Sequence, residues 1–505
     1  MNDVDVIIVG SGPAGVCAAL PPASAGRSVL VLERDTFPRH HIGESLLART
    51  VPYLKRLGVW DRLHEQGYVV KPGALFVWGG RDEPFVLDMP EPGYSFQVPR
   101  ASFDNLLLQE AVERGADVRQ QCRVVDVRQL DDGVVVTAVG PDGEFTARAR
   151  YVVDASGGNS LSARALGARS QEYDGARIAV SAYFTGATAI AEPHSGRIIT
   201  EASANGWIWF IPLSPDTVSV GLVSDARRLR ASASPRQALF EELATAGFTA
   251  GHLADATATS DFQVIRYANH RMIEPKWSGR IVRVGDAAMF VDPLFSTGVH
   301  GAVYSGYMAG SALAGCLAGE VEPADAAQVY NAHCDEYFER TRETVRLLYG
   351  FHPGDTPFWK DRSIPEMTAA EAAGSLAALG VPGAAIFHTM RHGLAMPAAF
   401  RAALADVVWP SAPSPVEVGR VLALRDNVEV RSGLVFHELG LVPGFTITSS
   451  DGCSASISIP DAGTHGAMLR ELAAQSAAGT GLRIGDHHSG LLAGALVSSG
   501  NASIA

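Results

Sequence analysis

Residues 5–15 read DVIIVGSGPAG, and this stretch decides the fold. Its apolar run predicts a β-strand, and the glycines after it predict a tight turn that opens a helix. Gly10 permits the turn, Gly12 lets a phosphate approach the backbone, and Gly15 lets the helix pack against the strand. The start of such a helix favours an anion such as a pyrophosphate. The stretch therefore predicts a dinucleotide-binding unit.

A second strand supports this assignment. Residues 28–33 read SVLVLE and end in Glu33, roughly 20 residues after Gly10, where an acid can accept hydrogen bonds from a ribose. The helix between the two strands contains Pro21 and Pro22. Because proline has no N–H and clashes with the preceding turn, we expect this helix to end or kink near Leu20.

Three later segments complete the pattern. Arg100 lies in VPRASFD just before a predicted helix over 103–114, the strand 151–154 leads into a small-residue turn, and VRVGDAA places Asp286 at a helix start. Together they resemble the para-hydroxybenzoate-hydroxylase-like flavoprotein fold. That resemblance implies an α/β fold with a Rossmann-type parallel sheet and a substrate-side β-sheet. It also implies that Asp286 binds the FAD ribityl chain and that Arg100 lies near the flavin, although Asp286 also fits an ordinary helix cap.

Residues 206–212 read GWIWFIP. On a strand Trp207 and Trp209 point to the same face, and Pro212 ends the strand. Two indoles on one face form a rigid apolar wall. A buried strand in a large core is the alternative interpretation.

Four motifs together indicate a resemblance to one family within this flavoprotein fold. They are PRHHIGESLL at 38–47, VKPGALFVWG at 70–79, DPLFSTGV at 292–299, and the double-tryptophan strand. They resemble the flavin-dependent halogenases of the bacterial natural-product type over about the first 350 residues. The resemblance implies that Lys71 is catalytic, that Trp207 and Trp209 wall off the flavin, and that Thr297 and Gly298 hold the halide, with Gly298 supplying conformational freedom. Glu44 is a candidate polar partner, with a buried structural carboxylate as the alternative. The implied cofactor-binding residues are Gly10, Gly12, Pro13, Ala14, Gly15, Glu33, Arg34, Arg100, Asp286, Gly298 and Val299.

By this resemblance the enzyme uses FADH2, oxygen and chloride: a flavin hydroperoxide oxidises chloride to hypochlorous acid, which then reaches Lys71. A desolvated lysine has a lowered pKa and is more nucleophilic, so Lys71 would form a chloramine or donate a hydrogen bond to the oxidant. The sequence leaves both roles open.

Substrate class rests on Phe295, which stands where the tryptophan-type halogenases have glutamate. The loop therefore resembles members that act on phenols, pyrroles or carrier-protein-tethered substrates, as does the spacing of Phe351, Phe358 and Trp359. Arg340, Arg342 and Arg346 lie on a predicted long helix over 324–349 but alternate with acids, which predicts a salt-bridged face.

Composition bounds the remaining possibilities. The flavin motifs predict one interwoven unit over 1–350, followed by an α+β cover over 351–505 that is helical to about 425 and β-rich over 427–460. The formal net charge is −13 without a basic block, so we expect no nucleic-acid partner. Five scattered cysteines indicate neither a metal site nor a disulfide framework. We expect no signal peptide, no membrane span and a cytoplasmic enzyme.

Two alternatives remain at this point. An NAD(P)H-dependent FAD aromatic monooxygenase would reduce its own flavin, whereas a halogenase would need a separate flavin reductase as partner. A flavoprotein without activity that serves in assembly is the more distant alternative, and Lys71 argues against both.

Overall fold

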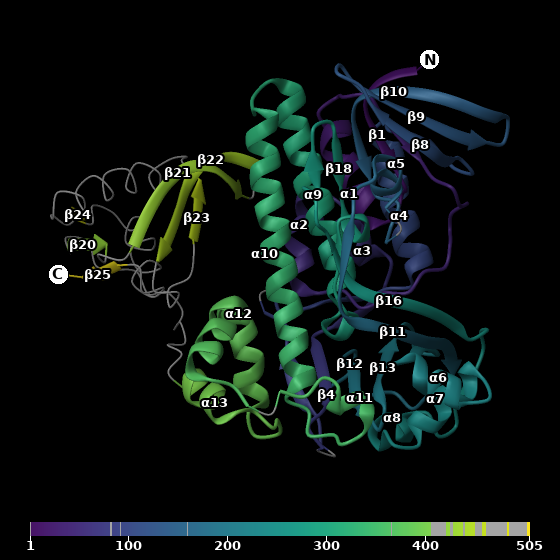
Figure 1. Cartoon of the computed structure of the whole chain (residues 1–505). Helices are drawn as coiled ribbons and strands as arrows, with labels where there is room; N and C mark the ends of the chain where they lie inside the picture. Colours follow the sequence, from purple (N-terminus) through teal and green to yellow (C-terminus); the bar gives the residue numbers. More distant parts are fainter. Residues whose placement is uncertain are drawn as a thin grey trace.

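Two β-sheets and two long helices organise the chain in the computed structural model (Figure 1). The structure describes residues 2–80, 83–90, 92–158, 160–364 and 366–405, and beyond them the strand segments 421–424, 428–437, 440–449, 457–460, 482–483 and 502–504.

The first sheet is built around β1 (Asn2–Val9), which pairs in parallel with β2 (Val29–Leu32) on one side and β10 (Gly143–Asp154) on the other. Parallel pairing continues to β7 (Asp117–Arg119) and β18 (Ile281–Arg283). The carboxyl ends of β1, β10 and β18 therefore meet at one edge, where parallel sheets bind ligands. The antiparallel strands that complete this sheet are β8 (Arg123–Gln129), β9 (Val134–Gly140) and β17 (Trp277–Ser278).

The second sheet has nine strands in the order β19-β16-β11-β14-β13-β12-β4-β5, with β15 paired to β11. All of its pairings are antiparallel except β12 with β4. Its strands are β4 (Gly73–Val77), β5 (Phe85–Asp88), β11 (Ser170–Thr185), β12 (Ile198–Ser203), β13 (Gly206–Pro212), β14 (Thr217–Ser224), β15 (Thr257–Ala258), β16 (Gln263–Met272) and β19 (Met289–Phe290). The double-tryptophan segment is β13, a central strand.

Helix α1 (Pro13–Ser24) continues through Pro21 and Pro22, so the predicted end near Leu20 is wrong. The physical reason is its packing against α9 (Thr297–Ala318). A Cβ added at Gly310 of α9 would lie 2.5 Å from the carbonyl oxygen of Ala18, the oxygen that Pro22 cannot bond. Burial against this glycine surface compensates for the missing hydrogen bonds.

The structure confirms the helices predicted over 103–114 and 324–349. The first is α4 (Arg100–Glu113), which covers the first sheet, and the second is α10 (Pro323–Gly350), the long central helix of Figure 1. The remaining helices are α2 (Val51–Arg56), α3 (Trp60–Glu65), α5 (Leu161–Leu166), α6 (Ala226–Ala231), α7 (Pro235–Leu243), α8 (Gly247–His252), α11 (Pro357–Lys360), α12 (Ala369–Met390) and α13 (Ala398–Ala405).

The helical prediction for the part of the chain after α10 holds for α12 and α13 but is wrong at β20 (Val421–Leu424). This strand pairs with β24 (Leu482–Arg483) and β25 (Ala502–Ile504), far away in the sequence. Such long-range pairing overrides local helix propensity. The predicted β character is confirmed in β21 (Val428–His437), β22 (Gly440–Ser449) and β23 (Ile457–Pro460), which form one antiparallel sheet.

Candidate active site

The turn between β1 and α1 has the geometry that its glycines predict. Gly10 has a φ of +98°, a conformation that residues with a side chain rarely adopt. A Cβ at Gly15 would lie 2.0 Å from the carbonyl oxygen of Gly10, so only glycine fits there. The amide and hydroxyl of Ser11 both donate to the Glu33 carboxylate at 2.8 Å, which fixes Glu33 beside the turn. Pro13 and Ala14 form the first turn of α1, with Gly12 as its cap.

The two arginines predicted near the cofactor lie in different environments. The Arg34 side chain is exposed and faces Asp35 at 3.5 Å. Arg100 is buried, and its guanidinium donates to both oxygens of Asp104 at 2.7 and 2.8 Å and to the Ile42 carbonyl at 2.8 Å. Arg100 therefore braces the segment that carries Glu44.

A pocket opens beside the N-terminus of α9. Burial raises the pKa of the Asp286 carboxyl on its wall. The Tyr337 hydroxyl donates to the Thr297 carbonyl at 3.0 Å, and no described atom lies within 4 Å of a Cβ built on Gly298. A desolvated carboxyl such as Asp286 can accept hydrogen bonds from the hydroxyls of a ribityl chain. The pocket is lined by Gly285, Asp286, Met289, Phe290, Val291, Thr297, Gly298, Gly301, Ala302 and Tyr337.

The loop 292–299 leads directly into α9 and is called the halide loop below. Thr297 and Gly298 begin the helix, and the first N–H groups of a helix have no intrahelical acceptor and attract anions. Ser296, with φ +58°, is the left-handed residue, whereas Gly298 lies inside the helix. The predicted need for conformational freedom at Gly298 is therefore wrong.

Lys71 ends β3 (Val69–Lys71) and is 1% exposed. Its Nζ donates to the Leu46 carbonyl at 3.0 Å, and no charged group of the described chain contributes to its pKa, which burial alone shifts. Burial lowers the pKa of Lys71 to about 7. The side chain is thus held as an amine that is about half neutral at physiological pH, as expected for a nucleophile.

Strand β6 (Ser95–Gln97) pairs with β3 and presents polar groups beside this lysine. Ser95 lies directly opposite Lys71 in the register, and Gln97 shares its face by strand alternation. The Ser95 hydroxyl, the Gln97 amide oxygen and the Ser45 hydroxyl, on a segment bridged to Gln97, are buried and find no partner in the described structure. Sequence analysis missed these residues because nothing in the local pattern marks them.

Glu44 is 1% exposed and accepts a hydrogen bond from the Tyr183 hydroxyl at 2.6 Å. Its second carboxylate oxygen is buried without a partner among the residues that the structure places. Burial raises the pKa of Glu44, so its carboxyl is biased toward the protonated form. Tyr183 also lies 2.9 Å from Nε2 of His40, which links Glu44 to the molecular surface.

The indoles of Trp207 and Trp209 are buried, with ring centroids 6.1 Å apart. The predicted common face is confirmed, since both rings join one hydrophobic cluster. Trp209 Nε1 donates to the Ser219 hydroxyl at 3.3 Å, and Trp207 Nε1 donates to the Tyr349 hydroxyl. Sequence analysis missed Tyr349, because it lies at the far end of α10.

A substitution at Gly221 tests how tightly the Trp209 indole is packed. A Cβ at Gly221 would lie 2.2 Å from Cζ2 of Trp209. We expect Gly221→Ala to displace the indole and to lower the free energy of unfolding by about 1–3 kcal/mol. Intrinsic tryptophan fluorescence and chemical denaturation would measure both effects. Gly247→Ala, where a Cβ meets no described atom within 4 Å, is the control; equal effects in both variants would contradict tight packing at Trp209.

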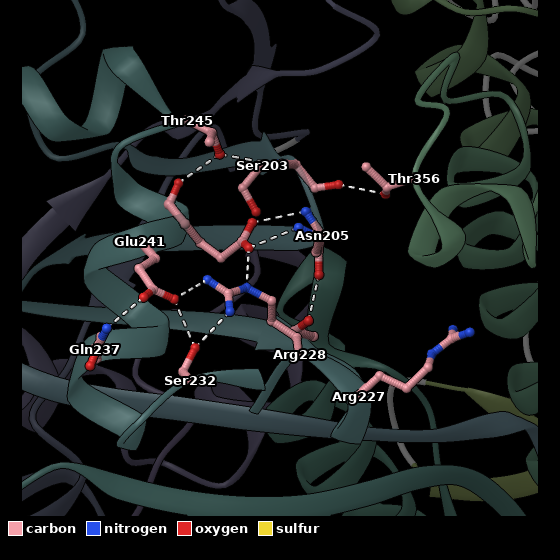
Figure 2. A network of polar contacts seen from close by, with 12 residues as sticks. Ser203, Asn205, Arg227, Arg228, Ser232, Gln237, Glu241, Thr245 and Thr356 are labelled. Atoms are coloured by element: carbon pink, nitrogen blue, oxygen red, sulfur yellow. Dashed lines mark hydrogen bonds and ion pairs between the residues drawn. The ribbon is translucent and has the colours of Figure 1, made fainter. Parts of the chain in front are cut away.

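Figure 2 shows how the turn before β13 is anchored. The backbone and side-chain amides of Asn205 donate to the Glu242 carboxylate at 2.8 and 3.1 Å, and the same carboxylate pairs with Arg228 of α6. On the other side, the Thr356 hydroxyl donates to the Ala204 carbonyl at 2.6 Å. The tryptophan wall is therefore fixed both by α6 and α7 and by the segment after α10.

Phe351, Phe358 and Trp359 belong to the core of this segment and are at most 2% exposed. Trp359 stacks on His352 at a centroid distance of 3.7 Å and donates to the Ser203 carbonyl at 3.0 Å. These aromatic residues hold the segment after α10 against β12.

Within the described residues, no group of three or more His, Cys, Asp or Glu side chains could hold a metal ion. None of the described helices is both long enough and apolar enough to span a bilayer.

Comparison with known proteins supports this picture. The family model of the FAD binding domain matches residues 3–343. A tryptophan 2-halogenase of Chondromyces crocatus is 32% identical, with 71% of this chain and 70% of that protein aligned. A 1H-pyrrole-2-carbonyl-[peptidyl-carrier protein] brominase of Pseudoalteromonas luteoviolacea is 33% identical over 61% of this chain and 77% of its own length.

Among solved structures, the flavin-dependent halogenase CmlS aligns with a TM-score of 0.76 at 25% identity, covering 100% of this chain and 96% of that one. The predicted FAD-binding α/β fold is thus confirmed.

Proposed function

This chain belongs to the flavin-dependent halogenases, and on that premise we propose that it chlorinates an electron-rich aromatic ring, phenolic or pyrrolic, in natural-product biosynthesis. It is an enzyme with FAD as its cofactor. The observation that carries the proposal is Lys71, a fully buried lysine with a pKa of about 7 and no counter-ion among the described residues. Such a site suits an amine that handles an electrophile.

Different cofactor-binding residues would bind different parts of FAD. The turn from Gly10 to Gly15 and the Glu33 carboxylate would bind the pyrophosphate and the ribose, and Asp286 the ribityl chain. When bound, reduced FAD and oxygen supply the oxidising equivalents that convert chloride to hypochlorous acid. Arg100 fixes the 42–44 backbone beside this site.

Two features separate the oxidant source from the substrate. The amides of Thr297 and Gly298 would bind chloride at the start of α9. The paired indoles of Trp207 and Trp209 would keep an organic substrate away from the flavin. This separation would prevent oxygen insertion into the ring.

Lys71 would then deliver chlorine to the ring. The neutral amine forms an N–Cl bond with hypochlorous acid and releases water, or the ammonium donates a hydrogen bond to the intact acid. In either case a C–Cl bond replaces a C–H bond, the ring loses its proton, and the oxygen of the acid leaves as water. Phenols and pyrroles are activated by their own heteroatom.

The pH dependence separates these two roles of Lys71. Below its pKa of about 7 the side chain is protonated and cannot attack. We expect the rate of halogenation to rise with pH through about 7, because the neutral amine is the reactive form. Single-turnover rates with chemically reduced FAD would measure this pH dependence over about pH 5.5 to 8.5, a roughly neutral range around the Lys71 pKa. A falling rate would assign the hydrogen-bonding role instead.

The proposed substrate class is supported by Phe295, whose ring packs on Phe76 at a centroid distance of 5.5 Å and offers no carboxylate. A carrier-tethered substrate is favoured by the relative whose name specifies a peptidyl-carrier protein. Free and tethered delivery are both part of the proposal. The arginines of α10 are salt-bridged as predicted, Arg340 to Glu336, Arg342 to Asp174 and Arg346 to Glu343, so a carrier would dock elsewhere.

The first test is mass spectrometry of a panel of phenols and pyrrole carboxylates, free and loaded on a carrier protein. The reactions contain the enzyme, FAD, NADH, oxygen, chloride and a separate flavin reductase. A chlorine isotope doublet that requires the reductase supports the proposal. Oxygen insertion without halide, with FAD bleached directly by NAD(P)H, would instead identify an aromatic monooxygenase.

A further inference from the structure

Asp292, the first residue of the halide loop, is fully buried and accepts an unusual number of hydrogen bonds. One carboxylate oxygen accepts from the Leu294 amide at 3.1 Å, within the loop. The other accepts from the hydroxyls of Tyr267 at 3.0 Å and Tyr349 at 3.2 Å. The Asp292 amide donates to the side chain of Asn269 at 2.6 Å. The start of the loop is therefore fixed from several elements.

The counter-charge of Asp292 is Arg177 of β11. Its Nε lies 3.1 Å from the Asp292 carboxylate, and the two side chains are 3% and 0% exposed. The Arg177 guanidinium also covers the ring of Tyr349 at 4.8 Å. A buried ion pair offers little net stability over apolar packing, so its presence at this loop calls for a functional reason.

The same carboxylate is connected to the tryptophan wall. Trp207 Nε1 donates to the Tyr349 hydroxyl, and that hydroxyl donates to Asp292. One chain of hydrogen bonds thus joins the wall to the loop that begins α9. A shift of Asp292 would move both together.

We propose that the Arg177–Asp292 pair positions the halide loop and neutralises the negative charge that would oppose the binding of an anion there. This inference rests on the proposed function, since it assigns halide binding to the amides of Thr297 and Gly298. Asp292 supplies the oxygen atoms that orient the loop and, through Tyr349, the wall. Arg177 neutralises the carboxylate, which would otherwise repel chloride from the same loop.

Three variants test whether removing one or both charges changes chloride affinity in the expected direction. Arg177→Met leaves an uncompensated carboxylate, so we expect chloride to bind about tenfold more weakly or worse. Asp292→Asn loosens the loop but leaves Arg177 with its second acidic neighbour, Asp174, so we expect a smaller loss of chloride affinity. In the double variant the charges are removed together, and we expect chloride affinity to recover toward that of the unaltered enzyme relative to Arg177→Met.

The measurement is chloride NMR line broadening on the FAD-loaded protein, together with the chloride KM and the yield of hydrogen peroxide. Lys276→Met is the control, because Lys276 is also a buried cation in an ion pair, although its partner Asp335 is 45% exposed, and neither residue belongs to the halide loop. We expect it to lower the unfolding temperature without changing chloride affinity. FAD affinity, followed by flavin fluorescence, should stay constant in all variants.

Recovery of chloride affinity in the double variant without a parallel recovery of the unfolding temperature supports the inference, because a purely structural pair would change the two quantities together. Unchanged chloride affinity in Arg177→Met, or additive losses in the double variant, would overturn it. If the unaltered enzyme neither binds chloride nor halogenates any substrate, the proposed function fails. The measurement on the unaltered enzyme therefore distinguishes failure of the proposed function from failure of the role assigned to the ion pair.

Discussion

Lys71→Met is expected to abolish halogenation and, at the same time, to stabilise the folded protein at pH 7. Acid–base and nucleophilic catalysis by one side chain contributes factors of about a hundred to ten thousand, so we expect at least about a hundredfold loss of product. Flavin oxidation and oxygen consumption should continue, because Lys71 is not among the residues assigned to the cofactor. Mass spectrometry and an oxygen electrode would measure the two quantities.

The stability effect follows from the Lys71 pKa, which is about 7 in the folded protein against the ordinary value of 10.5. Between these values the unfolded chain binds a proton that the folded chain does not. The free energy of unfolding therefore rises with pH across this window, and the full cost of burying the ammonium is present below pH 7. A methionine of similar length removes this cost, which is on the order of a few kcal/mol.

The control for this variant is Lys55→Met, because Lys55 is exposed on α2. It should change neither the product yield nor the pH dependence of unfolding. A destabilised Lys71→Met protein, or one that still halogenates, would show that Lys71 is a structural residue.

Gly15→Ala is expected to remove FAD from the enzyme. The added Cβ would lie 2.0 Å from the Gly10 carbonyl oxygen, and this backbone atom cannot rotate away. Separating α1 from the turn costs about 3 kcal/mol, which corresponds to roughly a hundredfold weaker binding of FAD. Fluorescence titration of the apoprotein with FAD would measure the change.

The matched control is Gly251→Ala on α8, where a Cβ meets no described atom within 4 Å. The same chemical change should leave FAD binding intact and, in a helix, slightly raise stability. Equal FAD affinity in both variants would contradict the close approach of α1 to the turn.

Local patterns were sufficient for the parts of the site that lie on one element. The strand–turn–helix of residues 5–15 and the acid at Glu33 were predicted because turn chemistry and strand periodicity act over a few residues. The common face of Trp207 and Trp209 followed from the two-residue period of a strand. Thr297 was singled out by the resemblance of the 292–299 motif to the halogenases, and its place at the start of α9 comes from the structure.

The amino-acid sequence by itself thus determined the FAD-binding unit and the common face of Trp207 and Trp209, and its resemblance to the halogenases singled out Lys71 as the candidate catalytic residue. Only the tertiary structure decided how α1 tolerates Pro21 and Pro22, because their missing hydrogen bonds are compensated by α9, far away in the sequence. The same holds for the Arg177–Asp292 pair, whose partners come from β11 and the halide loop. Burial and charge pairing depend on which distant residues meet, and no local pattern encodes that.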